Sequence, residues 1–209
     1  MLLKELWEEA KILLCHPVNI IHRMRLKYHG VKYGRRFMVT GRLKLKIRGR
    51  GANIIIGDDF SCLGDLDLRN RENGRIIIGN KVYFDHQIRL VAANDGTLSI
   101  GEGTSIASYF VCNAGVDMSV GKNCMFSGFV FINCSDHQMK KGVNICEQPY
   151  IHGEIKIGDD VFLGAHVYVM RGTVINNGAV VGANSVVNKD VPENAIAIGV
   201  PARIVGYRE

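Results

Sequence analysis

The sequence predicts an all-β protein, a parallel β-helix with an N-terminal helical segment and a protruding loop. The main observation is a six-residue period in the hydrophobic residues. Six hexads run in phase from residue 157, each with an aliphatic first residue and a small or β-branched fifth residue: IGDDVF, LGAHVY, VMRGTV, INNGAV, VGANSV and VNKDVP. A second observation is that glycine often follows the opening residue. Short β segments joined by tight corners satisfy both patterns.

Earlier in the chain the hexads come in groups of three, and we expect each group to be one triangular turn. The groups open with Ile78, Phe84 and Leu90, then Ile100, Ile106 and Cys112, then Val120, Phe126 and Ile132. Stacked turns would align these residues into internal ladders. We expect glycines at bends where a Cβ would crowd the next turn, namely Gly57, Gly79, Gly101, Gly121, Gly158, Gly164 and Gly182. The period alone does not give the hand of the coil.

Three regions are predicted: residues 1–40 as a basic, helical segment, 41–192 as the β-helix with a loop at 138–156, and 193–209 as a tail. At the start of the chain, Leu3, Leu6, Trp7, Ala10, Leu13 and Leu14 recur at helical spacing, and Pro17 is expected to stop that helix. We interpret it as a cap over the open end of the coil. The alternative is peripheral contact with an anionic membrane near a lipid-linked sugar, aided by Arg23, Arg25, Lys27, Lys32, Arg35 and Arg36.

Composition restricts the other function classes. Residues 1–50 contain 13 lysines and arginines against 3 acidic residues, but neither stacking aromatics nor nucleic-acid motifs accompany them, so no nucleic-acid partner is expected. The sequence has neither a long apolar run nor a secretory signal, which predicts a cytoplasmic protein, with the inner face of the membrane as an alternative location. The six cysteines form no C-x-x-C pair, so we expect buried thiols and neither disulfides nor a zinc cluster.

The run from Ile157 to Gly206, which ends in GVPARIVG, resembles the left-handed β-helix acetyltransferases, a family that includes galactoside, maltose and xenobiotic O-acetyltransferases. The resemblance covers roughly Ile56 to Gly206. It implies a left-handed coil, acetyl-CoA as co-substrate and a small-molecule or oligosaccharide acceptor. It also implies a homotrimer with active sites between neighbouring subunits.

His137 is the candidate general base. Histidine titrates near neutral pH and can accept a proton from an attacking hydroxyl. His137 ends a hexad just before the chain leaves the repeat at Gln138–Lys156, and the resemblance places the catalytic histidine at such a point. The excursion is long for a loop, so we interpret it as an arm that reaches a neighbouring subunit, with a flexible insertion as the alternative.

Four further residues are expected at the acceptor. Asn133 and Asp136 would orient the imidazole or contact the acceptor, and the resemblance implies an acceptor contact at Asn113. Many relatives carry Trp where this chain has Phe162. That replacement keeps an apolar wall but removes an N–H donor.

Coenzyme A is expected along the C-terminal coils, again by resemblance. The amides of Ala165 and Ala183 would meet the pantetheine chain, and the Ala165 amide would also stabilise the oxyanion. Lys189 and Arg203 would bind the nucleotide phosphates through charge-assisted hydrogen bonds. The tail 193–209 is therefore predicted to be part of the cofactor site.

These observations predict an acetyl-CoA-dependent O-acetyltransferase that acts on a hydroxyl of a sugar or polysaccharide precursor. Direct attack is expected, since no Cys or Ser stands in a nucleophile–base arrangement. An antibiotic acetyltransferase, a sugar N-acyltransferase and a non-enzymatic scaffold remain as alternatives. The metal-dependent carbonic anhydrases that share this repeat need two histidines five residues apart, and the sequence has no such pair, so no metal site is expected.

Overall fold

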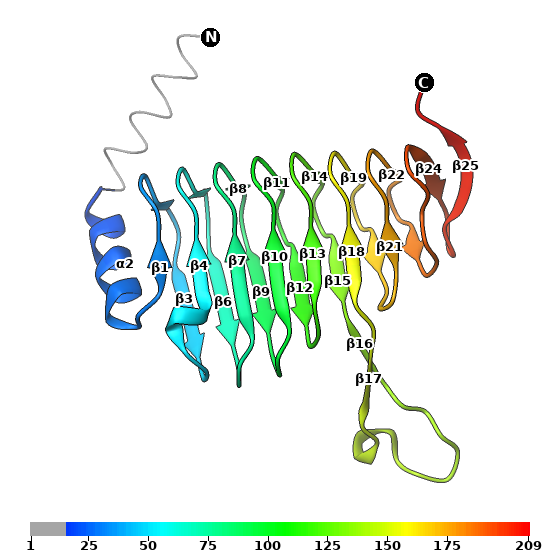
Figure 1. Ribbon diagram of the computed structural model, residues 1–209, viewed down its shortest axis with the longest axis horizontal. Helices are drawn as coiled ribbons and strands as arrows, with labels where there is room; N and C mark the ends of the chain where they lie inside the picture. Colours follow the sequence, from blue (N-terminus) through cyan, green and yellow to red (C-terminus); the bar gives the residue numbers. More distant parts are fainter. Residues whose placement is uncertain (1–15) are drawn as a thin grey trace.

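The computed structural model describes residues 16–209, which form a three-sided stack of parallel coils with a helix at one end and an arm projecting from its side (Figure 1). Each coil contributes one strand to each of three parallel faces. The chain therefore folds as the predicted parallel β-helix, and successive coils pair through their backbones rather than through long loops.

The helix and the strands of each face have the following bounds. The helix is α2 (His16–Tyr28). The first face contains β1 (Lys32–Tyr33), β4 (Ile54–Ile56), β7 (Arg75–Ile78), β10 (Thr97–Ile100), β13 (Met118–Val120), β18 (Ile155–Ile157) and β21 (Val174–Ile175). The second face contains β2 (Met38–Val39), β5 (Ser61–Cys62), β8 (Tyr83–Phe84), β11 (Ser105–Ile106), β14 (Met125–Phe126), β19 (Phe162–Leu163), β22 (Val180–Val181), β24 (Ala195–Ile198) and β25 (Arg203–Tyr207). The third face contains β3 (Leu43–Ile47), β6 (Leu66–Asn70), β9 (Ile88–Ala92), β12 (Val111–Ala114), β15 (Phe131–Asn133), β20 (Tyr168–Val169) and β23 (Val186–Val187).

The interior consists of the predicted ladders. Ile78, Ile100 and Val120 are register partners on the first face, and the opening residues on the other two faces align in the same way. All of these side chains are at most 3% exposed. Burial of one such aliphatic side chain contributes about 1.5–3 kcal/mol. The hexad period is therefore the periodicity of the core.

Close approach between coils explains the glycines. A Cβ on Gly101 would lie 2.4 Å from the carbonyl oxygen of Gly121, and a Cβ on Gly121 would lie 2.4 Å from that of Gly158. Neither glycine has a positive φ. Residues with a positive φ at this corner include Asn123 (φ 54°) and Asp160 (φ 54°). Crowding by the neighbouring backbone, rather than backbone conformation, therefore requires glycine here.

The β-helix extends beyond both of its predicted boundaries. Strands β1 and β2 pair with β4 and β5, so coiling starts inside the segment 1–40, and β24 pairs with β22 inside the segment 193–209. The chain then turns back, and β25 pairs antiparallel with β24. Strands of two residues at the ends of the stack leave almost no periodic signal, which is why the sequence pattern alone missed them.

Helix α2 covers the open end of the first coil. Leu26 is fully buried, the buried Asn19 side chain accepts a hydrogen bond from the amide of Val39 (2.8 Å), and His22 Nε2 lies 2.9 Å from the carbonyl oxygen of Gly41. Pro17 lies in the first turn of this helix, where its missing N–H costs nothing. The helix that Pro17 was predicted to stop is a different one, and it lies outside the described residues. The apolar face predicted over Leu3–Leu14 lies outside the described residues.

The basic residues near α2 bind backbone carbonyls and acidic side chains. Arg23 donates to the carbonyl of Phe37 (3.0 Å) and Arg25 to that of Leu43 (2.7 Å). Arg35 and Arg36 pair with the acidic residues Asp58 and Asp59 at the next corner. Much of the N-terminal positive charge thus closes the end of the coil. None of the described helices has the length and apolar character needed to cross a membrane.

The predicted loop is an ordered hairpin arm. Strands β16 (Ser135–His137) and β17 (Tyr150–His152) pair antiparallel, and the coil resumes at β18, slightly before the predicted residue 157. At its tip, near the short 3-10 helix η2 (Ile145–Glu147), the buried Gln148 side chain bonds both backbone groups of Lys140 and the carbonyl of Val143. The hydrogen bonds of Gln148 argue against a flexible insertion.

A second 3-10 helix, η1 (Gly51–Asn53), precedes β4.

Four of the cysteines are buried as predicted: Cys62, Cys112, Cys124 and Cys134. Cys146 is exposed in the arm, so the prediction was wrong there; the arm leaves the core, and its apolar residues have nothing to pack against. Cys15 lies outside the described residues. Burial raises the pKa of Cys62 and of Cys134 to about 12, which keeps both thiols protonated and unreactive.

Candidate active site

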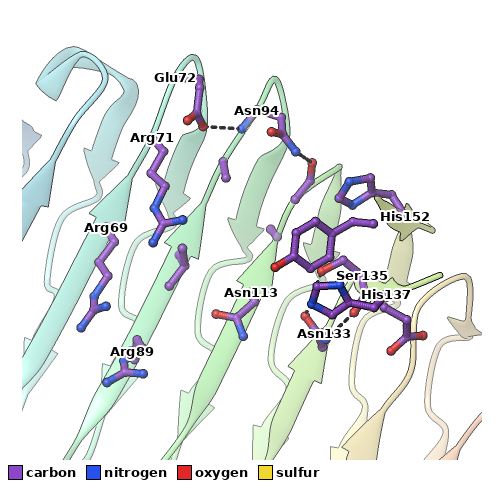
Figure 2. A pocket seen from close by; sticks show the side chains of 16 residues that line it. Arg69, Arg71, Glu72, Arg89, Asn94, Asn113, Asn133, Ser135, His137 and His152 are labelled. Atoms are coloured by element: carbon purple, nitrogen blue, oxygen red, sulfur yellow. Dashed lines mark hydrogen bonds between the residues drawn. The ribbon is translucent and has the colours of Figure 1, made fainter. Parts of the chain in front are cut away.

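An open cleft of about 590 Å³ lies on the third face at the base of the arm. Its walls come from the coils of β6, β9, β12 and β15 and from the two strands of the arm. Four predicted residues line it together: Asn113, Asn133, Asp136 and His137. Figure 2 shows Asn113 and Asn133 on the coil and His137 at the point where the arm leaves it.

The start of the arm positions His137. The backbone pairing of β16 with β17 sets His137 opposite Tyr150, whose ring centroid lies 4.2 Å from that of the imidazole. The amide of Gln138 donates to the carbonyl of Pro149 (3.0 Å) and locks the next pair of the hairpin. His137 is therefore held on a rigid hairpin whose first residues still belong to the coil, and it faces the cleft.

The imidazole has an unsatisfied nitrogen. Nδ1 of His137 is buried and has no hydrogen-bond partner among residues 16–209. Buried polar atoms almost always have a protein or water partner, and Nδ1 is the buried side-chain nitrogen of this cleft that lacks one among residues 16–209.

Neither Asp136 nor Asn133 holds the imidazole. Asp136 accepts a hydrogen bond from Arg171 Nε (2.8 Å), and this ion pair ties the arm to the following coil. The Asn133 side-chain amide donates to the carbonyl of Ser135 (2.5 Å). Asn113 and Asn133 are register partners on β12 and β15, and both are half-buried on the outer surface next to His137.

The other end of the cleft is cationic. Arg69, Arg71 and Arg89 line it (Figure 2). A buried carboxylate, Asp67, accepts hydrogen bonds from Arg69 Nε (2.8 Å) and Nη2 (2.6 Å) and lies 3.8 Å from Arg89 Nε. Burial tends to raise the pKa of Asp67, but the hydrogen bonds from Arg69 and the charges of both arginines outweigh it, so the net pKa is lowered. The carboxylate stays ionised and orders the guanidinium groups.

Ala165 and Ala183 lie outside this cleft, at the corner between the second and third faces. They stack on consecutive coils, since Asn184 donates its amide to the carbonyl of Ala165 (2.8 Å). The amides of Ala165 and Ala183 themselves donate to no other described residue, so two backbone donors are unpaired on consecutive coils. Such donors fit the amide carbonyls of pantetheine, and small side chains leave them accessible.

The remaining predicted residues are spread over other surfaces. Phe162 is 38% exposed on the second face, in register with Met125 and Val180. Lys189 is exposed in the turn after β23, and Arg203 is exposed on β25, where its Nη1 donates to the carbonyl of Ala202 (2.9 Å). Both cations are available for phosphate, but the chain does not bring them into one pocket with His137.

Sequence reasoning missed Tyr150, His152 and the three arginines of the cleft. Tyr150 and His152 meet His137 only because the arm folds back on itself, which no local pattern signals. The arginines did carry a signal: Arg69 and Arg89 occupy outward-facing positions of their strands. Among the described residues, no cluster of three or more His, Cys, Asp or Glu side chains could hold a metal ion.

Comparison with known proteins agrees with this architecture. Residues 154–189 match the family model described as bacterial transferase hexapeptide (six repeats). A putative lipopolysaccharide biosynthesis O-acetyl transferase of Escherichia coli, WbbJ, is 32% identical over 143 residues, which cover 65% of this chain and 73% of WbbJ. A probable acetyltransferase of Mycobacterium tuberculosis is 30% identical over 66% of this chain, and the match spans only 46% of that longer protein.

Solved structures extend the similarity over most of the fold. The polySia-specific acetyltransferase NeuO superposes with a TM-score of 0.72 at 27% identity and covers 85% of this chain and 81% of its own. A hexapeptide-repeat acetyltransferase of Vibrio cholerae, complexed with acetyl-coenzyme A, is 30% identical with a TM-score of 0.51 over 54% of this chain and 61% of its own.

The chain belongs to the hexapeptide-repeat acetyltransferases, and its coil is the left-handed parallel β-helix of that family.

Proposed function

We propose that this protein transfers the acetyl group of acetyl-CoA to a hydroxyl of a sugar or polysaccharide precursor. The observation that carries the proposal is His137 beside an open polar cleft, on a rigid hairpin at the edge of the coil. The printed functions of relatives support the acceptor class: WbbJ is named for lipopolysaccharide biosynthesis and NeuO for polySia. No observation favours an antibiotic or an amine acceptor.

In this mechanism His137 acts as general base. Because Nδ1 is buried, the acceptor hydroxyl would meet Nε2, which takes up its proton as the oxygen attacks the thioester carbonyl. The C–S bond would then break, and the proton would pass from Nε2 to the departing coenzyme A thiolate. Asn113 and Asn133 hold the neighbouring sugar hydroxyls, and Asp136 acts through Arg171 to keep the arm in place. Direct transfer fits the buried, protonated thiols, which cannot serve as nucleophiles.

Coenzyme A fits the unpaired amides of Ala165 and Ala183. Bound there, acetyl-CoA supplies an activated thioester. Lys189 and Arg203 then bind its phosphates, and the Ala165 amide stabilises the developing oxyanion. Phe162 provides an apolar wall for the acceptor.

We further infer that the protein is a homotrimer and that each active site lies between two copies. The separation of Phe162 and the cations from the His137 cleft supports this arrangement. We place the enzyme in the cytoplasm. The exposed Ile20, Ile21, Met24 and Tyr28 on α2 are the surface that would touch the inner membrane face.

A screen of acceptors tests the function. Purified protein is incubated with acetyl-CoA and with sugars, oligosaccharides, nucleotide sugars or antibiotics, and free thiol and acetylated product are both measured. We expect thiol release coupled to O-acetylation of a saccharide. Coupled release with antibiotics alone would contradict the acceptor class, and failure to bind coenzyme A would favour a scaffold.

A further inference from the structure

The third face carries a row of positive charges that leads to the active-site cleft. We define the cationic track as six residues on three consecutive coils: Lys44, Lys46, Arg48, Arg69, Arg71 and Arg89. All except Arg69 are exposed. Three of them, Arg69, Arg71 and Arg89, line the cleft itself (Figure 2), and the strand register joins these to the other three.

The strand register connects the track to His137. One outward-facing row runs from Lys46 through Arg69, Val91 and Asn113 to Asn133. Adjacent strands lie about 4.8 Å apart, so this row extends about 19 Å. A bound molecule that reaches from His137 to Lys46 must therefore be extended, because one compact anion would contact only part of it.

Asp67 makes part of the track a built site. Its side chain is only 11% exposed, and it pairs with Arg69 and approaches Arg89. The Arg71 side chain has no hydrogen bond or ion pair to any residue of the described chain, and Arg89 keeps 48% of its side chain exposed. Glu72 is the other carboxylate at this end, and it accepts a hydrogen bond from the Asn94 amide. The cations therefore outnumber the acids: the Arg71 guanidinium is unpaired among the described residues, and Arg89 makes only a long ion pair of 3.8 Å with Asp67.

The side chains between the cations favour a glycan over a nucleic acid. The described strands β3, β6 and β9 contain no aromatic residue on which a base could stack. The end of the track that lies beside His137 presents the amides of Asn113 and Asn133, which suit hydroxyl groups, together with the ring of Tyr150.

We propose that the acceptor is an acidic glycan, a chain whose successive sugars carry anionic groups that bind along the cationic track. This inference rests on the proposed function and names the substrate class of the same site. Arginine binds a carboxylate through two parallel hydrogen bonds, and the extended row provides several binding positions for consecutive sugars. The track holds the chain while one sugar hydroxyl reaches His137.

Direct binding of oligosaccharides to the full-length protein tests the inference without relying on turnover. The probes are a short oligosaccharide of sialic or uronic acids, the same oligosaccharide with its carboxylates reduced to alcohols, a nucleotide diphosphate sugar and a single-stranded oligonucleotide. We expect the acidic oligosaccharide to bind best, with an affinity that falls as salt is raised.

The matched variants are Arg71→Ala/Arg89→Ala on the track and Arg75→Ala, an exposed arginine on the first face, as the control. The track variant should bind the acidic oligosaccharide about tenfold or more weakly, and the control should not change. Coenzyme A binding should be the same in all three proteins. That measurement also verifies that the track variant is folded.

Equal binding of the acidic and carboxyl-reduced oligosaccharides, or no loss in the track variant, would overturn the inference. Preferential binding of the nucleotide sugar or of the oligonucleotide would also overturn it. If the acidic oligosaccharide binds as expected but no acetyl group is transferred to any acceptor, the proposed function fails while the track remains a glycan site. If the track variant acetylates the acidic oligosaccharide as well as the wild type does, the function holds and this inference fails.

Discussion

At the residue scale, the position of His137 could be predicted, but its surroundings could not. The end of a hexad run marks where the coil opens, and that is visible in the sequence. The pairing of Asp136 with Arg171 joins residues 35 positions apart, and the contact with Tyr150 depends on how the arm folds back. Such contacts arise from tertiary pairing and have no local pattern.

Lys189 and Arg203 are predicted to bind coenzyme A. Replacing either residue with Ala should weaken the binding of coenzyme A by about 1–3 kcal/mol, which is the usual contribution of a hydrogen bond to a charged group. Dephospho-coenzyme A should reduce the loss for the residue that contacts the missing phosphate. Lys122→Ala, an exposed lysine at the corner between the first and second faces, serves as control. If neither variant loses affinity in a direct titration, the cofactor site lies elsewhere on the coil.

The buried thiols give a prediction about pH. In the folded protein burial raises the pKa of Cys62 and Cys134 to about 12 from the ordinary 9.0. A raised pKa stabilises the fold fully below pH 9, and the contribution is lost as the pH rises toward 12, because the unfolded chain then releases more protons. The free energy of unfolding should therefore fall with pH above about 9.

Thiol labelling followed by peptide mapping verifies the same environment. Cys146 should react at once, and Cys62 and Cys134 should react only as the protein unfolds. Equally fast labelling of Cys62 and Cys146 would show that the coil is open.

At the element scale, the regular coils could be predicted and the ends of the stack could not. Residues 157–192 keep the hexad phase, and the fifth residue of each hexad is buried, as at Val161 and Thr173. Near the N-terminus the coil begins with two-residue strands, and α2 combines buried polar residues with exposed apolar ones. The polar side chains of α2, among them Asn19 and His22, bond backbone groups at the end of the coil. Such a helix does not show the usual amphipathic pattern.

Helix α2 is predicted to stabilise the stack as its cap. Leu26 is fully buried against the first coil, so Leu26→Ala should cost about 2–5 kcal/mol and lower the melting temperature. Met24 lies on the same helix but is 66% exposed, and Met24→Ala should change stability by less than about 0.5 kcal/mol. Thermal unfolding and amide exchange at the first coil measure the effect of each substitution on stability. Equal, small effects of the two substitutions would show that α2 does not act as a cap.

At the scale of the whole molecule, charge asymmetry was visible in the sequence but its placement was not. The positive charge of residues 1–50 divides between two roles: Arg23 and Arg25 bind carbonyls at the end of the coil, and Lys44 and Lys46 lie on the third face. Only the strand register shows that this face leads to His137. The same register separates Phe162 and Arg203 from the cleft, which is why a complete site is proposed to need a second copy.

The most direct test of the account is acetyl transfer by the intact protein with His137→Ala. We predict that kcat falls by about 10²–10⁴ while the dissociation constant of coenzyme A is nearly unchanged, because the base acts only in the transfer step. His86→Ala, an exposed histidine paired with Asp85 at another corner, is the matched control and should retain activity. A loss of less than about tenfold at neutral pH in His137→Ala would contradict the assignment of His137 as general base.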